Sequence, residues 1–268
     1  MPQARSEETH GHVQRGQRFA DFSPFASCYI AVCECLREKA DLERLVLEVA
    51  EDASASGALW IEPALSIDLY ADQFGGVEAT LHLLFQAAEA AEEATQVAMG
   101  FIVAAERHLP VARAEALAKK VRDVVTSGAG IHGRPGILGF GLHSDEVRFC
   151  VDHLKAVRIA HGVLAAEDQE LVEHLAKLQV CLDVCPTSNE LLGVMPVTES
   201  ALTKLLAAGV PCTINSDDPL LFGSSLLGEF RRCRDELKMS DEQLAACAVP
   251  RTFGQTLLFE GAIIYLKS

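Results

Sequence analysis

The sequence lacks the features of membrane and nucleic-acid proteins. No apolar run approaches the roughly 20 residues that a membrane-spanning helix needs. Lysine and arginine are not clustered, and the net charge is -15. Contacts to phosphate groups need clustered positive charge, which is missing here. We therefore expect neither a nucleic acid nor a membrane as a partner.

Several motifs of catalysis and cofactor binding are also missing. The chain has no P-loop and no glycine-rich dinucleotide turn after a strand. Ser224-Ser225 lacks the Gly-x-Ser-x-Gly elbow of serine hydrolases. Pro211-Cys212 is followed by Thr-Ile-Asn, so the Pro-Cys-x-x-Cys motif of one zinc deaminase architecture is absent.

The nine cysteines form no regular framework, which argues against a disulfide scaffold. Met1 to Phe19 is polar and has no apolar core of a secretion signal, and Glu7 and Glu8 weigh against a transit peptide. We expect a cytoplasmic protein with a disordered polar leader at residues 1–18 and one domain at residues 19–268.

Short apolar runs alternate with amphipathic helical patterns, as in parallel α/β folds. Helices are expected at Asp41–Ala55, Glu78–Gln96, Arg113–Thr126, Glu167–Leu178 and Thr198–Ala208, and a capping box at Ser240 predicts another. Strands buried on both faces are expected at Ala58–Glu62, Val97–Ala104, Ile137–Leu142, Ala156–His161, Val180–Cys185 and Pro211–Asn215.

One connection between expected strands is very short. His143 to Lys155 is near the minimum of about 10–12 residues for a whole crossover, with room for one short helix at Asp145–Leu154. Because about six βα units are recognisable, the sequence predicts an incomplete barrel with open sheet edges.

Three motifs follow three successive expected strands: Arg158-Ile-Ala-His161-Gly162, Cys185-Pro-Thr-Ser-Asn189 and Asn215-Ser-Asp217-Asp218-Pro219. The C-terminal ends of barrel strands are where active sites are built. Together with Gly139-Phe-Gly-Leu-His-Ser-Asp145-Glu146, their order and spacing resemble the adenosine deaminase family of zinc hydrolases.

This resemblance implies a TIM (β/α)8 barrel that hydrolytically deaminates a purine nucleoside or base with one Zn²⁺ per chain. It implies that Asp217 is a zinc ligand, that Asp218 contacts the purine ring, and that His161 is catalytic, orienting and polarising the water on the metal. These roles suit the chemistry, because a carboxylate ligates zinc and zinc lowers the pKa of bound water toward about 7.

Two elements of the family pattern are not recognisable. The His-Ala-Gly-Glu strand is expected between Glu146 and Val147, where the sequence passes straight to the next helix. His10-Gly11-His12 has the spacing of the N-terminal zinc motif, but no apolar strand surrounds it. We interpret that pair as part of the polar leader and His153 as a helix-surface residue.

Each candidate residue also has a structural interpretation. Asp217-Asp218-Pro219 is typical turn chemistry, and a lone histidine at a strand end is usually a buried, hydrogen-bonded residue. Cys181 and Cys185 are interpreted as buried small hydrophobic residues rather than metal ligands. Asp145-Glu146 is equally compatible with a substrate-side acid pair and with the acidic first turn of a helix.

The sequence is therefore compatible with three functions. The first is zinc-dependent deamination of a small-molecule purine. The alternative is a catalytically inactive or truncated family member that acts as a purine-binding or interaction protein. A third, weaker hypothesis is a barrel amidohydrolase with another amide or aminopurine substrate. The sequence leaves the oligomeric state open.

Overall fold

The structure is a computed structural model that describes residues 16–20, 22–105, 110–144, 147–153, 155–199, 201–248 and 263–266. For residues 111, 141–144 and 263–266 only the backbone is considered. Within these ranges, no helix is both long and apolar enough to cross a membrane. Residues 1–15 of the expected leader, including both histidines of His10-Gly11-His12, lie outside the described residues, as do Asp145-Glu146. Gly16, within the expected leader, donates from its backbone N to Leu221 O at 2.9 Å.

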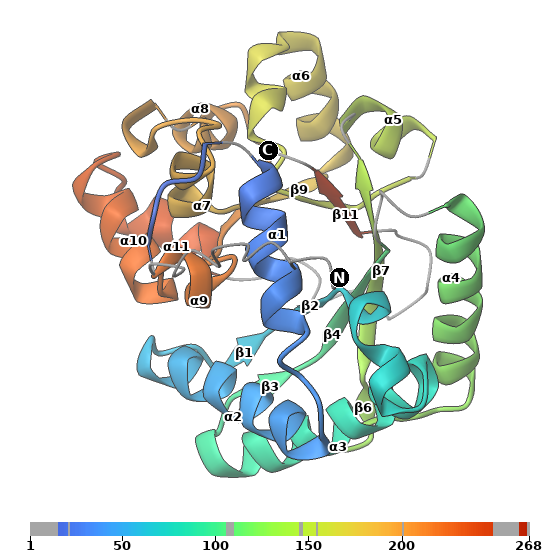
Figure 1. The fold of residues 1–268 in the computed structure, drawn as a ribbon. Coiled ribbons are helices and arrows are strands. Elements are labelled where there is room, and N and C mark those ends of the chain that lie inside the picture. Colours follow the sequence, from blue (N-terminus) through green and yellow to red (C-terminus); the bar gives the residue numbers. More distant parts are fainter. Residues whose placement is uncertain are drawn as a thin grey trace, which may run out of the picture.

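A parallel sheet of seven strands forms the interior, in the order β10-β9-β8-β11-β7-β4-β2. The connecting helices lie outside these strands (Figure 1), and the strands are mostly apolar, with Arg158, Asp183 and Thr213 as buried polar exceptions. The strands are β2 (Ala64–Leu65), β4 (Phe101–Ala105), β7 (Ile137–Ser144), β8 (Arg158–Ala160), β9 (Cys181–Val184), β10 (Cys212–Ile214) and β11 (Ile263–Leu266).

The first two expected strands are each interrupted. β1 (Trp60–Ile61) pairs with β3 (Ala98–Met99), and β2 then pairs with β4 in the same register. The break in the first strand falls at Glu62-Pro63, since proline cannot donate a backbone hydrogen bond to a ladder. The pattern thus located both strands correctly but not their interruption.

The expected helices are present with small shifts at their ends, and the capping box at Ser240 is confirmed. The sequence patterns did not predict α1, α7, α9 or α10. They also did not predict the short hairpin of β5 (Gly130–Ile131) and β6 (Arg134–Pro135). The helices are α1 (Phe22–Cys33), α2 (Lys39–Ala55), α3 (Val77–Thr95), α4 (Val111–Thr126), α5 (Val147–Asp152), α6 (Gln169–Leu178), α7 (Pro186–Leu191), α8 (Leu202–Ala207), α9 (Pro219–Phe222), α10 (Leu226–Asp235) and α11 (Asp241–Cys247).

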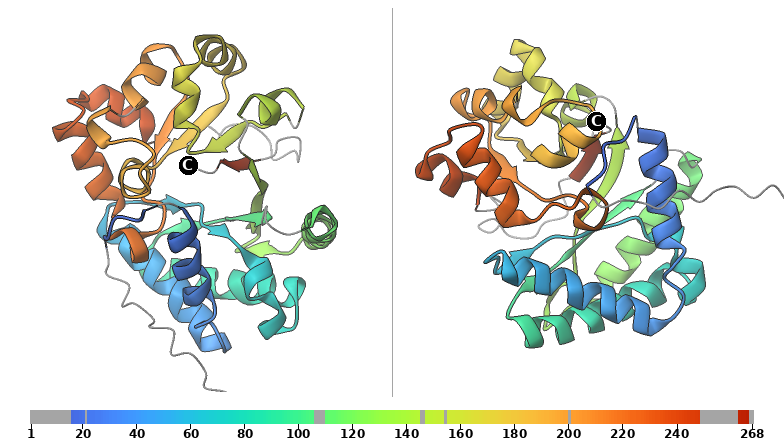
Figure 2. Two further views of the ribbon diagram at one scale, coloured as in Figure 1. Left: turned by 45° about the horizontal axis from the view of Figure 1, so that its top comes forward. Right: turned by 60° about the vertical axis from the view of Figure 1, so that its left-hand side comes forward.

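The hydrophobic core has two parts. One is formed by residues from Cys33 to Ile137 and the other by residues from Val147 to Cys247. The two views of Figure 2 show the blue-to-green half of the chain on one side of the molecule and the yellow-to-red half on the other. The short crossover through α5 is the direct chain connection between these halves.

A strand from the end of the chain lies between the two halves. β11 pairs in parallel with β7 on one side and with β8 on the other, for example through Ile264 to Leu142 and to Ile159. The missing His-Ala-Gly-Glu strand was expected at this place in the order. No pattern in the sequence had indicated a strand there.

The sheet is open among the described residues, because its outer strands β10 and β2 are not paired with each other. The expectation of an α/β barrel-like fold that is incomplete is therefore confirmed. α1 crosses in front of the barrel in Figure 1, and the ring of Phe25 stacks on that of Phe222 in α9 at 5.0 Å.

Candidate active site

The candidate site lies at the C-terminal ends of β8, β9 and β10, which are adjacent in the sheet. The ladder continues just past the strands, since His161 N donates to Asp183 O at 2.8 Å and Asn215 N donates to Val184 O at 2.9 Å. These bonds fix where each strand ends. His161, Cys185 and Asp217 therefore leave three neighbouring strands at one edge.

Two of these residues have an unusual backbone. His161 has φ of 60° and Asp217 has φ of 57°, in the left-handed region that few residues other than glycine adopt. Such conformations cost about 1–3 kcal/mol and concentrate at functional sites. The two turns direct the imidazole and the carboxylate toward each other, with 3.5 Å between His161 Nε2 and Asp217 Oδ2.

The imidazole of His161 is held from its other side. Its Nδ1 lies 3.1 Å from Oδ1 of Asn189, which is buried in α7. An amide oxygen accepts hydrogen bonds, so Nδ1 is placed to donate to Asn189. Nε2 faces the carboxylate of Asp217.

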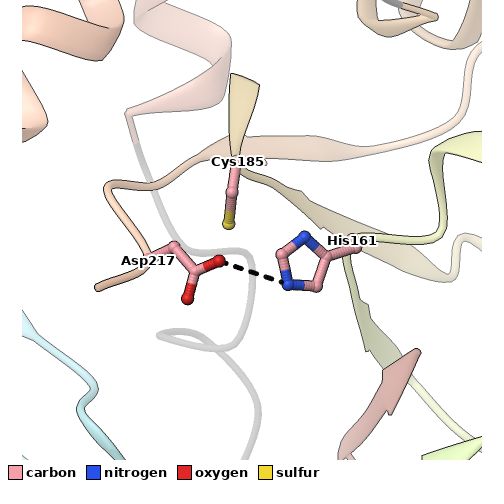
Figure 3. A group of neighbouring side chains, drawn as sticks. All are labelled: His161, Cys185 and Asp217. Carbon is pink, nitrogen blue, oxygen red and sulfur yellow. Dashed lines mark ion pairs between the residues drawn. The ribbon is translucent and has the colours of Figure 1, made fainter. Parts of the chain in front are cut away.

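Cys185 completes the group. One donor atom from each of His161, Cys185 and Asp217 lies within 4.8 Å of the other two, and Figure 3 shows the three side chains directed toward one another. Cys185 is 6% exposed. Burial raises the pKa of its thiol well above the usual range, and the nearby carboxylates of Asp217, Asp183 and Glu229 raise it further.

Asp218 is the N-cap of α9. Its Oδ1 accepts a hydrogen bond from Leu221 N at 3.2 Å, and Pro219 occupies the first turn. Burial and the charge of Asp217 raise the pKa of Asp218 to about 6. The turn interpretation of this sequence is therefore correct for Asp218, whose carboxyl group also lies next to Asp217.

A buried ionic network supports the strands below the site. Arg158 forms ion pairs with Glu62 and with Asp183, and Thr213 Oγ1 donates to Asp183 Oδ1 at 2.6 Å. Burial alone would lower the pKa of Arg158, but the charges of Asp183 and Glu62 raise it overall. This network ties β8, β9 and β10 together within the barrel and connects them to the segment after β1.

A second network holds α7, the helix that follows Cys185. Glu229 of α10 is 1% exposed and accepts a hydrogen bond from Thr187 N at 3.0 Å. Arg232 donates to Thr187 Oγ1 at 2.9 Å and pairs with Glu190 at 2.7 Å. The Cys185-Pro-Thr-Ser-Asn189 motif thus forms the beginning of α7, and α10 fixes its position.

The family resemblance implies a zinc ion, and the donor set can be tested against that ion. Zinc is bound by imidazole nitrogen, thiolate sulfur and carboxylate oxygen, often with three protein ligands and one open position in catalytic sites. His161, Cys185 and Asp217 supply one atom of each kind. The described residues therefore fit zinc, although through a different set of ligands from three histidines and one aspartate.

The structure brings His161, Asp217 and Asp218 together, as the sequence motifs predicted. Cys185 is buried, as the sequence interpretation expected, and its Sγ also lies within 4.8 Å of donor atoms of His161 and Asp217. The signal for Cys185 was its position, directly after a buried strand like His161 and Asp217. His153 follows α5, is exposed and stacks on Phe149, so its interpretation as a surface residue is confirmed.

Comparison with known proteins identifies the family of the chain. The adenosine deaminase family model matches residues 1–149 and 139–252. A Streptomyces coelicolor protein assigned to adenosine/adenine deamination is 34% identical over 259 residues, covering 84% of this chain and 73% of that protein. An adenine deaminase of Rhizobium rhizogenes is 33% identical over 254 residues, covering 84% and 79%.

Solved structures share the fold. The crystal structure of an adenine deaminase from Arthrobacter aurescens has a TM-score of 0.75 at 24% identity, covering 86% of this chain and 79% of that one. An amidohydrolase from Burkholderia ambifaria with bound zinc has a TM-score of 0.66 at 18% identity, covering 80% and 67%. The chain thus belongs to the adenosine deaminase family of hydrolytic deaminases.

Proposed function

We propose that this protein hydrolytically deaminates an aminopurine, adenine or adenosine, with the help of a bound zinc ion. The main support is the convergence of His161 and Asp217 at adjoining strand ends, 3.5 Å apart. The relatives named for adenine and adenosine deamination support the same substrate class. When bound, the metal would supply Lewis-acid activation of water.

The side chains have distinct tasks in this proposal. Asp217 would hold the ion, and His161, whose Nδ1 is fixed by Asn189, would orient and polarise the attacking water. Asp218 lies beside Asp217, where its carboxyl group would hydrogen-bond to the purine ring.

The assay uses the full chain purified with Zn²⁺. Adenine and adenosine are supplied separately, and both the purine absorbance and released ammonia are followed. Asp217→Asn should abolish turnover, while Asp72→Asn on an exposed turn should leave it unchanged. An absence of turnover together with substoichiometric metal would overturn the proposal for this polypeptide.

One observation favours a second candidate, a purine-binding protein without turnover. The place between β7 and β8 is taken by the Ile-Ile-Tyr-Leu segment of β11, which has no acid or histidine. The family's glutamate would shuttle a proton there, and proton transfer of this kind contributes about 10²–10⁴ in rate. Calorimetric binding of adenine without ammonia release would support this candidate.

The transcript offers a direct check on the same point. The missing His-Ala-Gly-Glu strand was expected between Glu146 and Val147. A transcript with an in-frame segment at this junction would describe a longer protein with the proton-shuttling glutamate. A transcript that matches the printed sequence would leave β11 as the strand at this place.

A further inference from the structure

Three elements direct three different donor atoms to one place. His161 follows β8, Cys185 follows β9 and Asp217 follows β10, and their donor atoms lie within 4.8 Å of one another. Figure 3 shows the three side chains directed toward one another. Bound zinc would draw these atoms closer, because zinc–ligand distances are about 2.0–2.3 Å.

The imidazole is prepared for metal binding. Its Nδ1 lies 3.1 Å from Asn189 Oδ1, and its Nε2 faces Asp217. Ligating histidines usually bind metals in this way, with the second ring nitrogen donating to an oxygen that fixes the ring. Asn189 is 3% exposed, so water competes little for this bond.

Cys185 differs from the other buried cysteines in its surroundings. Cys150, Cys212, Cys233 and Cys247 belong to the hydrophobic core. Cys185 instead lies beside the carboxylate of Asp217, and the charges of Asp183 and Glu229 also act on its thiol, which donates a hydrogen bond to Asp183 O at 3.7 Å. This excess of negative charge would attract a cation, and a divalent ion would allow the thiol to deprotonate.

We propose that Cys185 is a metal ligand and that, in the substrate-free protein, Cys185, His161 and Asp217 together bind one zinc-type ion. The fourth position is open to water, as in catalytic zinc sites with three protein ligands. The inference rests on the proposed function only for the presence of an ion. In the substrate-free protein, His161 would thus bind the ion directly instead of orienting the water.

The test uses Co²⁺ as a spectroscopic substitute for zinc in the full chain. A thiolate ligand produces a charge-transfer band in the near ultraviolet, and we expect one such band that saturates at one Co²⁺ per chain. Cys185→Ser should remove the band and weaken Co²⁺ binding more than about 100-fold, since even outer-shell changes cost about 10–100-fold. Cys181→Ser is the matched control, because Cys181 is buried in β9, the strand that Cys185 directly follows.

A second measurement does not depend on a variant. X-ray absorption at the zinc edge of the wild-type protein should show one sulfur at about 2.3 Å with nitrogen and oxygen neighbours. Zinc bound without a sulfur neighbour would overturn the proposal, as would a charge-transfer band that persists in Cys185→Ser. Failure of the chain to bind Co²⁺ or Zn²⁺ at all would also overturn it.

Ammonia release separates this inference from the proposed function. A thiolate band without turnover would support the ligand role of Cys185 and count against deamination. Turnover with metal but without the band would support deamination and count against Cys185 as a ligand. A His161→Ala variant that keeps full Co²⁺ affinity would overturn the ligand role of that histidine.

Discussion

His161 Nε2 and Asp217 Oδ2 lie 3.5 Å apart, although their strands β8 and β10 are separated in the sheet by β9. The contact is possible because both residues adopt left-handed backbone conformations just beyond their strands. Cys185, at the end of the intervening strand, completes the group. The order of the strands thus determines which three side chains meet.

Asn189 should act as a positioning residue for His161. We expect Asn189→Ala to lower Co²⁺ affinity by about 10–100-fold, because the ring loses the bond that fixes its tautomer. Titration by absorbance measures this change. Asn189→Asp keeps an acceptor for Nδ1 and should restore most of the affinity, whereas equal losses in both variants would contradict the positioning role.

Glu229 and Glu190 should make opposite contributions to the pH dependence of stability. Burial raises the pKa of Glu229 above 4.5, so its contribution is present at low pH and is lost as the pH rises through the folded-state pKa. The hydrogen bond from Arg232 lowers the pKa of Glu190, so its contribution is lost as the pH falls below 4.5.

The two glutamine variants test this contrast. At neutral pH, Glu229→Gln should raise the free energy of unfolding and Glu190→Gln should lower it. Both differences should diminish in acid, where the wild-type carboxyl groups become protonated. Urea unfolding of the metal-free protein, carried out between about pH 4 and pH 8, measures the free energy of unfolding of each variant. Shifts of the same sign in the two variants would refute the assignment.

Arg158 should be essential for folding stability. Arg158→Met leaves Asp183 and Glu62 buried without their cation, which typically costs about 3–5 kcal/mol of unfolding free energy. Chemical denaturation measures the loss. Arg148→Met, which breaks the exposed pair with Asp168, is the control and should change stability little.

β11 should hold the two halves of the sheet together. Ile264→Pro removes a backbone donor from a strand that is paired on both sides, so it should lower the thermal unfolding midpoint clearly. Gln169→Pro, at the first position of α6, is the control because proline is tolerated there. Equal midpoints for Ile264→Pro and the wild type would show that β11 contributes little.

The sequence by itself determined the parallel α/β class, most strand positions and the family. Apolar runs mark strands that are covered on both faces, and the motifs after β8, β9 and β10 are local patterns. The same reasoning placed His161 and Asp217 at one edge, since parallel strands end on the same side of a sheet. These conclusions depend on neighbouring residues in the chain and on general rules of barrel architecture.

Only the tertiary structure showed the surroundings of Cys185 and the pairing of β11. A cysteine after a buried strand can face a core or a polar site, and the choice depends on carboxylates from other strands and from α10. The pairing of Ile263–Leu266 with β7 and β8 joins segments distant in the chain. Such contacts depend on which strand edges the rest of the fold leaves unpaired. No local sequence pattern shows this.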